Sequence, residues 1–286
     1  MYKIIEKQAL SDIIKLMVIE APQIAKKAKA GQFIILRINE FGERIPLTIA
    51  DFDLGAGTIT VIFQEVGKST RHLWTLNPGD YLATFAGPLG NPSEIKKYGT
   101  VVCVAGGVGV APIYSIAKAL KNAGNRVIAI MGARNKGLLF WEDRMKNVSD
   151  ELIVCTDDGS YGRKAVVTAP LKEILSANKI DRVWAIGPAI MMKFVSLLTR
   201  DFNIPTIVSL NTIMIDGTGM CGGCRVLLEE GARFVCVDGP EFDGHKIAWD
   251  SLLARQGIYR NEEANSLKQW EHICHLEKST EKDKLK

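Results

Sequence analysis

The first 90 residues alternate short apolar runs with turn-forming residues. Gly, Pro, Asn or Asp stands between most of these runs. Short strands at this spacing, separated by turn signals, are typical of an antiparallel barrel or sandwich. One helical pattern interrupts them at residues 67–76. We therefore expect an antiparallel β-barrel over residues 1–95. Its predicted strands are YKIIEKQ, DIIKLMVIE, GQFIILRI, PLTIADF, GTITVIFQ and GDYLATFAG.

From about residue 99 the pattern changes to continuous β-branched runs, each followed by an amphipathic helical pattern. Strands that are buried on both faces of a parallel sheet have such runs. Pro112 and Pro188 stand where two of the helices would begin. Residues 96–210 are therefore predicted to form a doubly wound, parallel α/β domain. Its strands are expected at 100–105, 126–131, 152–156, 182–187 and 206–210.

After residue 211 neither pattern continues, and glycines and cysteines dominate as far as a helical pattern at 248–257. Residues 211–257 are therefore expected to form a small third module. Residues 258–286 would add a C-terminal helix and a charged, solvated tail. The helix carries an apolar stripe that would dock on a partner or on the core of this chain. The stripe consists of Leu267, Trp270, Ile273 and Cys274.

The composition is that of a folded protein. Of the 286 residues, 47% are hydrophobic and 24% are charged, which excludes a wholly disordered chain. The 36 basic and 32 acidic residues give a net charge of +4, a balance too even for a nucleic-acid binder. No stretch resembles a signal peptide or is apolar enough to span a bilayer. We therefore expect a cytoplasmic protein that binds neither nucleic acid nor a membrane.

The residues GGVGVAP at 106–112 follow a predicted strand and open a helix. Glycines here allow the backbone to approach a pyrophosphate, although a tight turn between strand and helix requires glycine in any case. Three other strands end in similar segments, and such ends meet at one edge of a parallel sheet. This edge is the candidate nucleotide site, with Gly106, Gly107, Gly109, Pro112, Gly132, Ala133, Arg134, Asp157, Asp158, Gly159, Gly187 and Pro188.

Whether this nucleotide is NAD or NADP stays open. Arg134 could contact a 2′-phosphate, or its side chain could simply be solvated.

The predicted barrel holds a second anion-binding pattern. Arg44 stands four residues before Thr48, and Gly67-Lys68-Ser69-Thr70 places a loop with free amides at a helix start. An arginine together with a helix N-terminus would clamp a diphosphate. An arginine alone would more often lie on a solvated face.

The third module carries the most specific pattern. The sequence reads D-x4-C-x2-C-x11-C, whereas a plant-type [2Fe–2S] loop has C-x4-C-x2-C and a distant cysteine. Asp216 therefore stands in the slot of the first cysteine, ahead of Cys221, Cys224 and Cys236, and a carboxylate can ligate iron. A zinc site, a cysteine-rich loop without metal, and His245 as the fourth ligand are the alternatives. The remaining cysteines, expected to be packing residues, are Cys103, Cys155 and Cys274.

The motifs RIPLTI, VGKSTRHLWTLNPGD, AGPLGNP, AGGVGVAP, GAR, TDDGSYG and IGP resemble the ferredoxin–NADP⁺ reductase superfamily over residues 1–210. The resemblance implies that the barrel binds FAD and that the α/β domain binds NAD(H) or NADP(H), with the glycines at 106, 107 and 109 receiving the nicotinamide nucleotide. Many plant-type members end in an aromatic residue that stacks on the flavin, whereas this chain ends in a lysine-rich tail. The residues that would hold FAD are Arg44, Pro46, Leu47, Thr48, Ile49, Gln64, Gly67, Ser69 and Thr70.

With Asp216 in the first ligand slot, nearly the whole chain resembles the small (alpha) subunits of NADH-dependent reduced ferredoxin:NADP⁺ oxidoreductases, a sulfide dehydrogenase-like family. That family implies a heterodimer with a larger subunit that resembles the glutamate synthase small subunit and carries FAD and [4Fe–4S] clusters. The heterodimer performs flavin-based electron bifurcation with ferredoxin.

The implied chemistry is a relay between NAD(H), FAD and a [2Fe–2S] cluster, with no catalytic acid, base or nucleophile. Two functions compete with it. One is the electron-transfer subunit of dihydroorotate dehydrogenase, which uses four cysteines, and the other is a free-standing ferredoxin–NAD(P)⁺ reductase.

Overall fold

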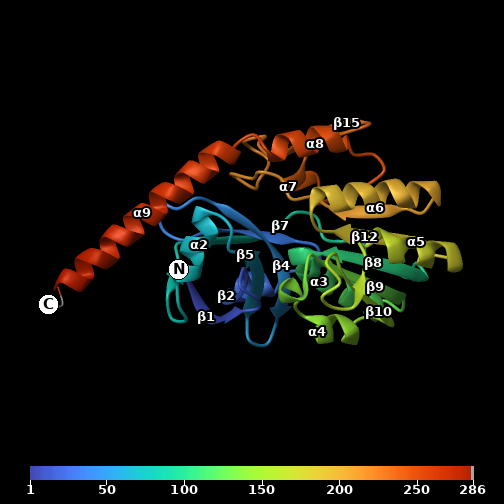
Figure 1. Cartoon of the computed structure of the whole chain (residues 1–286), viewed down its shortest axis with the longest axis horizontal. Helices are drawn as coiled ribbons and strands as arrows, with labels where there is room; N and C mark the ends of the chain where they lie inside the picture. The colour runs from blue at the N-terminus through green and yellow to red at the C-terminus, as the bar shows by residue number, and fades with distance from the viewer. Residues whose placement is uncertain (285–286) are drawn as a thin grey trace.

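The computed structural model describes the backbone of residues 1–284 and the side chains of residues 1–272. The chain forms a β-barrel, a sheet with helices on both faces, and a C-terminal segment that lies across both (Figure 1). The expected fold class is confirmed. Among the described residues, no helix is long and apolar enough to cross a membrane.

The N-terminal barrel is a seven-stranded sheet in the order β6-β1-β2-β5-β4-β3-β7. The two edge strands, β6 and β7, follow each other in the chain, so the barrel is nearly closed. All of the pairings are antiparallel. The elements are β1 (Tyr2–Ala9), β2 (Ile14–Glu20), α1 (Pro22–Ala25), β3 (Phe33–Arg37), β4 (Ile45–Asp53), β5 (Thr58–Gln64), α2 (Lys68–Thr75), β6 (Tyr81–Leu82) and β7 (Thr84–Leu89).

The second sheet has the order β11-β10-β9-β8-β12-β13-β16. Every pairing is parallel except that of β13 with β16. Strands β10, β9, β8, β12 and β13 give the doubly wound order 3-2-1-4-5. The elements are β8 (Thr100–Gly106), η1 (Gly107–Gly109), α3 (Val110–Asn122), β9 (Arg126–Ala133), η2 (Lys136–Leu138), α4 (Glu142–Asn147), β10 (Glu151–Thr156), β11 (Arg163–Lys164), α5 (Thr168–Ala177), β12 (Arg182–Ile186), α6 (Ala189–Asp201) and β13 (Thr206–Ser209).

The two faces of this sheet bury different neighbours. On β8, Val101 and Cys103 belong to a core with α3 and with barrel residues such as Leu16. The alternate residues Val102 and Val104 belong to a core with α5, α6 and the C-terminal segment. The side-chain alternation of β8 therefore assigns neighbouring residues to two separate cores, the second of which joins the cysteine segment to the barrel residues Phe33 and Ile35.

The C-terminal segment joins this sheet rather than standing beside it. Strand β16 pairs antiparallel with β13, with Phe242 opposite Val208. Helix α8 packs on α6, and its residues Trp249 and Leu252 are buried in the shared core. The segment contains β14 (Arg225–Leu228), β15 (Gly231–Phe234), α7 (Val235–Asp238), β16 (Glu241–Asp243) and α8 (Trp249–Gln256).

Helix α9 (Arg260–Lys284) leaves this segment and returns to the barrel, where it contacts α2 (Figure 1). Trp270 lies 6.5 Å from His72 between ring centroids, and Glu271 forms an ion pair with Arg71. The expected stripe therefore meets this chain's own barrel at Trp270. The side chains of Ile273 and Cys274 lie outside the described residues.

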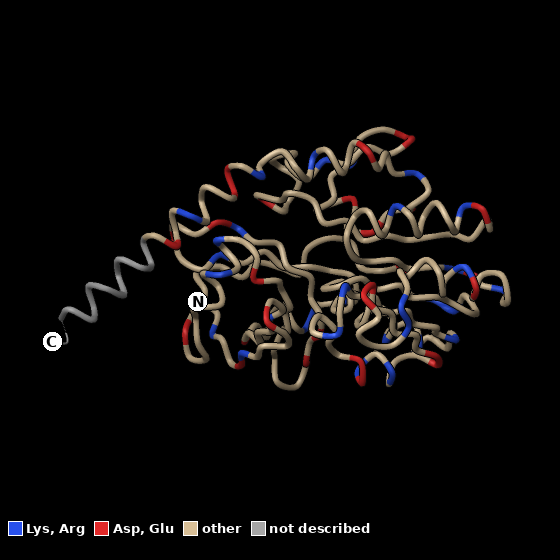
Figure 2. The backbone as a smooth tube through the Cα atoms, in the orientation of Figure 1, with Lys and Arg blue, Asp and Glu red and all other residues tan. Residues whose placement is uncertain are grey.

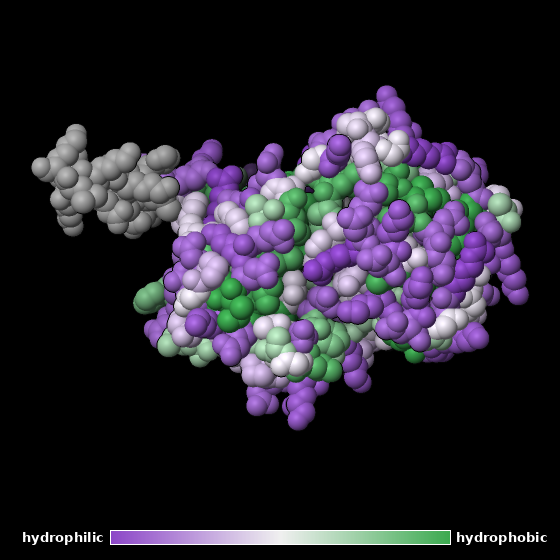
Figure 3. Space-filling model, turned by 90° about the horizontal axis from the view of Figure 1, so that it is seen from below, coloured by the Kyte–Doolittle hydropathy of each residue, from purple (hydrophilic) through white to green (hydrophobic). Residues whose placement is uncertain are grey.

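Charges of both signs are scattered over all parts of the chain (Figure 2). Seen from below, hydrophilic side chains cover most of the surface, with apolar patches between them (Figure 3). One ionic contact joins the barrel to the sheet domain, since Asp51 on β4 pairs with Lys118 at 3.2 Å and with Arg144 at 3.6 Å.

Replacing Gly109 with alanine is expected to lower the free energy of unfolding by about 1–3 kcal/mol, the usual cost of overpacking. The reason is a close approach of two backbones, because a Cβ on Gly109 would lie 2.1 Å from the Ile186 carbonyl oxygen. Denaturant unfolding measures the change. The control is Gly137→Ala, whose Cβ would meet only Asn135 Oδ1 at 3.4 Å. Equal losses in the two variants would contradict this account.

Candidate functional site

The barrel places its candidate residues around the start of β4 and the first turn of α2. Ser69 donates a hydrogen bond to the carboxylate of Glu43, which joins these two segments. The hydroxyl of Thr70 accepts from the Gly67 amide at 3.1 Å and caps the helix. The expected residues are Arg44, before β4, Pro46, Leu47, Thr48 and Ile49 on β4, Gln64 at the end of β5, Gly67 at the N-cap of α2, and Ser69 and Thr70 in its first turn.

The glycine-rich loop of the sheet domain faces this part of the barrel. Gly107 has a φ of +54°, and a Cβ built on it would lie 4.0 Å from Gln64 Nε2, with nothing nearer. At the neighbouring strand end, a Cβ on Gly187 would lie 3.0 Å from the Gly106 backbone, and one on Gly106 would lie 3.1 Å from Pro188. The candidate residues at the ends of β8 and β12 are therefore adjacent.

The ends of β9 and β10 are tied together by their backbones. The amide of Asp157 donates to the Ala133 carbonyl at 3.0 Å, and the amide of Asp158 donates to the Arg134 carbonyl at 3.2 Å. Hydrogen bonds from Ser160 hold the pKa of Asp158 below its usual range. The side chains of Arg134, Asp157 and Asp158 are all exposed at this edge.

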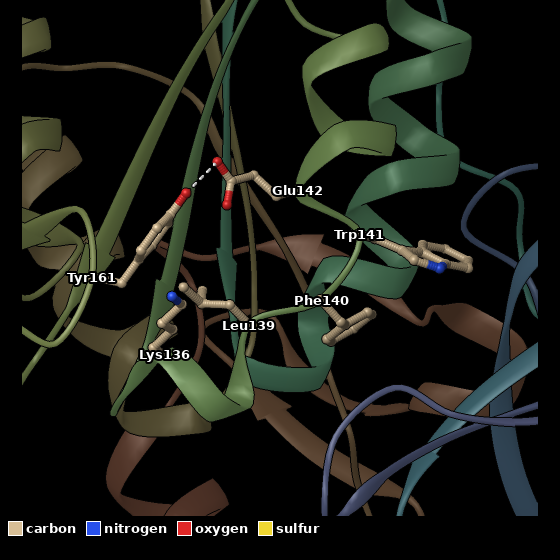
Figure 4. A pocket seen from close by; sticks show the side chains of 6 residues that line it. All are labelled: Lys136, Leu139, Phe140, Trp141, Glu142 and Tyr161. Atoms are coloured by element: carbon tan, nitrogen blue, oxygen red, sulfur yellow. Dashed lines mark hydrogen bonds between the residues drawn. The ribbon is translucent and has the colours of Figure 1, made fainter.

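A pocket of about 380 Å³ opens beside these strand ends. Tyr161 and Glu142 point toward each other across it, 3.1 Å apart at their oxygens (Figure 4). Trp141 packs edge-on against Tyr114 at 5.1 Å between centroids. No sequence motif marks this pocket, because its aromatic residues stand at irregular spacing in two separate loops. Its lining residues are Lys136, Leu139, Phe140, Trp141, Glu142 and Tyr161.

The four expected ligands of the third module fall into two pairs. The thiol of Cys224 lies 3.2 Å from the sulfur of Cys236, and both residues are buried. Cys221 is exposed, and hydrogen bonds from the backbone amides of Gly223 and Asp216 lower its pKa, which places Asp216 beside it. No three such side chains among residues 1–272 converge on one point where a single metal ion could sit. Two pairs fit a two-iron cluster, in which each iron takes two protein ligands.

Hydrogen bonds around the loop support anionic ligands at Asp216 and Cys221. The carboxylate of Asp216 accepts from the hydroxyl and the amide of Thr218, which lowers its pKa. The Gly223 amide, 3.5 Å from the Cys221 sulfur, lowers the pKa of that thiol. Burial raises the pKa of Cys236 to about 12, and a metal ion would deprotonate it. The donor set therefore fits an iron–sulfur cluster.

The cysteine loop is docked on the barrel. The guanidinium of Arg44 donates to the Asp216 carbonyl at 3.1 Å. Gly217 has a φ of +81°, and a Cβ there would lie 2.2 Å from the Ile35 side chain. A group held by the loop and a group held at the start of β4 would therefore have a fixed separation.

The segment after Cys236 is held by the linker between the barrel and the sheet domain. The Asn91 side chain donates to the Val237 and Asp238 carbonyls, both at 3.1 Å. The Asn91 amide donates to the Gly239 carbonyl at 2.7 Å. Asn91 thus fixes three consecutive peptide groups next to a candidate ligand.

Glu241 provides a further tie at this junction. The hydroxyl of Ser93 in the linker donates to its carboxyl group at 2.5 Å. A Cβ on Gly31 of the barrel would lie 3.2 Å from the same carboxyl group. Burial raises the pKa of Glu241.

His245 is engaged away from the cysteine loop. Its Nε2 lies 3.0 Å from the Thr199 hydroxyl on α6, and Arg200 donates to its carbonyl. Asp216 therefore remains the candidate for the fourth ligand. Cys103 and Cys155 are buried within β8 and β10, whereas the Cys274 side chain lies outside the described residues.

Two parts of the chain match known domain families. Residues 103–197 match the oxidoreductase NAD-binding domain. Residues 211–248 match the iron-sulfur cluster binding domain of dihydroorotate dehydrogenase B.

Similar proteins cover nearly the whole chain. A Thermotoga maritima homolog of the electron transfer subunit of dihydroorotate dehydrogenase B (NAD⁺) is 48% identical, over 91% of this chain and 92% of that protein. The corresponding Desulforamulus reducens subunit is 32% identical, over 82% and 92%. A structure of the NADH-dependent reduced ferredoxin-NADP oxidoreductase, described for its flavin-based electron bifurcation, superimposes with a TM-score of 0.90. It is 46% identical and covers 94% of this chain and 98% of that one.

Glu241→Gln is expected to stabilise the protein increasingly as the pH rises above the ordinary glutamate pKa of 4.5. The folded-state pKa lies above the ordinary value of 4.5, so the carboxyl contributes stability at low pH and loses it as the pH rises through the folded-state pKa. Glutamine stays neutral and still accepts from Ser93. The difference in Tm between the variant and the wild type measures the effect.

The control is Glu94→Gln. Hydrogen bonds from Lys96 and Tyr98 lower the pKa of Glu94, so this variant should lose stability relative to the wild type as the pH rises. A pH-independent Tm difference for Glu241→Gln would contradict the prediction.

Proposed function

Because this chain belongs to the family of dihydroorotate dehydrogenase B electron transfer subunits and their homologues, we propose that it is an electron-transfer flavoprotein subunit. It moves electrons between NAD(H), FAD and a [2Fe–2S] cluster. One observation carries the proposal: Arg44, at the expected flavin site, bonds directly to Asp216, at the expected cluster site. The ligand thiols require a reducing compartment, so we place the protein in the cytoplasm.

FAD would bind on the barrel, with its diphosphate between Arg44 and the first turn of α2. The guanidinium supplies a charged fork, and the amides from Gly67 to Thr70 supply donors at a helix N-terminus. Glu43 now accepts from Ser69, and the same hydroxyl could donate to a phosphate instead. Gln64, another of the expected FAD residues, lies next to Gly107 of the glycine-rich loop.

NAD(H), or NADP(H), would bind along the ends of β8, β9, β10 and β12. Gly107 leaves open space in front of its backbone, which suits close approach by a nucleotide. The pocket beside Tyr161 would take the adenosine end, because it is aromatic and adjoins the exposed Asp157 and Asp158. Arg134 is the residue that would meet a 2′-phosphate.

The [2Fe–2S] cluster would be held by Asp216 and Cys221 on one side and by Cys224 and Cys236 on the other. When bound, the cluster accepts and passes on single electrons. The protein holds the loop against the barrel, so that the distance between a bound flavin and a bound cluster would be fixed.

We also propose that the chain works in a bifurcating complex with ferredoxin and NADP⁺. Support comes from the match at 46% identity to the ferredoxin-NADP oxidoreductase structure and from Asp216 in the ligand slot. The partner would be a larger subunit that resembles the glutamate synthase small subunit and carries flavin and [4Fe–4S] clusters. It would meet the loop where Ile215 is 60% exposed and Met220 87% exposed beside Cys221.

The alternative is the electron-transfer subunit of dihydroorotate dehydrogenase, which the match at residues 211–248 favours. Purification of the native complex distinguishes the two. A partner with dihydroorotate dehydrogenase activity would overturn the bifurcating assignment, whereas a partner with FAD and [4Fe–4S] clusters would support it.

Arg44→Ala is expected to abolish retention of FAD, because a charge-assisted bond to a diphosphate contributes about 1.5–3 kcal/mol.

Gly107→Asn should keep FAD yet weaken NADH binding at least tenfold, since asparagine tolerates positive φ but fills the space before the loop. Flavin absorbance after gel filtration and anaerobic NADH titration measure the two effects. Full FAD retention in the first variant, or unchanged NADH affinity in the second, would place these sites elsewhere.

Asp216→Cys should keep the cluster but change its EPR g-values and reduction potential, because a thiolate is a more covalent ligand than a carboxylate. Cys224→Ala should lose the cluster and leave FAD bound in the barrel. If Asp216→Cys and Asp216→Ala both give wild-type spectra and potentials, Asp216 is not a ligand.

A further inference from the structure

A second arginine contacts the cysteine loop, at Gly223 rather than at Asp216. Arg255, in the last turn of α8, donates to the Gly223 carbonyl at 3.1 Å. Gly223 lies between Cys221 and Cys224, and its amide donates to the Cys221 sulfur at 3.5 Å. Arg255 thus contacts a residue that directly precedes Cys224 and stands two positions after Cys221.

The position of Arg255 is set by the packing of its helix. Trp249 and Leu252 of α8 are buried, and the Trp249 ring nitrogen donates to the Gly244 carbonyl at 3.0 Å. The next residue, Gln256, donates to the Asn211 carbonyl at 2.6 Å. Helix α8, which carries Arg255, is therefore held both in the shared core and by the chain that enters the loop.

The charge of Arg255 is not neutralised locally. Within residues 1–272, no carboxylate oxygen lies close enough to Arg255, within 4.0 Å, to form an ion pair. Asp250, also on α8, pairs instead with Lys193 of α6 at 2.7 Å. The side chain is half-buried and lines a small cavity with Thr212 and Gly223. An unpaired positive charge in such a place is weakly screened by solvent.

We propose that Arg255 is a positioning residue that holds the turn between Cys221 and Cys224 and raises the reduction potential of the bound cluster. The inference rests on the proposed function. Reduction adds one electron to the cluster and breaks no bond, so the reduced state carries one more negative charge. A nearby fixed positive charge stabilises that state over the oxidised one. Arg255 thereby favours electron transfer from flavin to cluster.

The test compares Arg255→Gln and Arg255→Lys in the full chain with its cofactors bound. The cluster is titrated with dithionite, and its EPR signal gives the midpoint potential. Gln keeps a donor for the Gly223 carbonyl but removes the charge, so its potential should fall. Lys keeps the charge, so its potential should stay near that of the wild type.

The matched control is Arg200→Gln. Arg200 on α6 also donates to a backbone carbonyl, that of His245, and its loss should leave the cluster potential unchanged.

Other outcomes are equally decisive. An unchanged potential in Arg255→Gln, or equal shifts in Gln and Lys, would overturn the role of the charge. Arg255→Ala, which removes the donor as well as the charge, tests the positioning role: loss of iron from Ala but not from Gln or Lys would support that role, and full retention of iron in Ala would overturn it. A wild-type protein with FAD but no [2Fe–2S] signal would instead overturn the proposed function.

Discussion

The attachment of the cysteine loop to the barrel is the constraint on which the rest of the arrangement depends. Asn91 donates to three consecutive carbonyls after Cys236, and Arg44 donates to the carbonyl of Asp216. Each contact joins a backbone carbonyl, so each fixes the path of the chain rather than one rotatable side chain. A redox group in the loop therefore cannot move relative to a flavin on the barrel without breaking several bonds at once.

The central sheet allows this attachment without crowding the nucleotide edge. Leu16 and other barrel residues pack with α3 on one face, whereas the cysteine segment packs with α5, α6 and the barrel residues Phe33 and Ile35 on the other. Beyond the ends of β9, β10 and β12, Arg134, Asp157, Asp158 and Pro188 remain exposed. One sheet thus keeps three binding regions adjacent and separate, as a relay requires.

The sequence predicted well what depends on local pattern. Alternating and continuous apolar runs predicted strands of both sheets. The glycines at 106 to 109 marked a close approach of two backbones, since Gly109 leaves no space for a Cβ beside Ile186. Contacts between distant residues had no such signal. The bond from Arg44 to Asp216 spans 172 residues, and no local pattern foretells that β16 would join β13. The pocket beside Tyr161 was missed for the same reason, because its walls come from separate loops.

The pairing of strand β16 also implies an order in which the parts of this protein fold. Its partner β13 and the linker residue Asn91 both lie earlier in the chain, and a chain emerging from the ribosome folds its N-terminal domains first. The last candidate ligand, Cys236, can reach its final place only after barrel and sheet exist to receive the residues that follow it. Iron and sulfide would therefore enter a nearly finished molecule, and a truncated chain would present Asp216, Cys221 and Cys224 without the surface that completes their site.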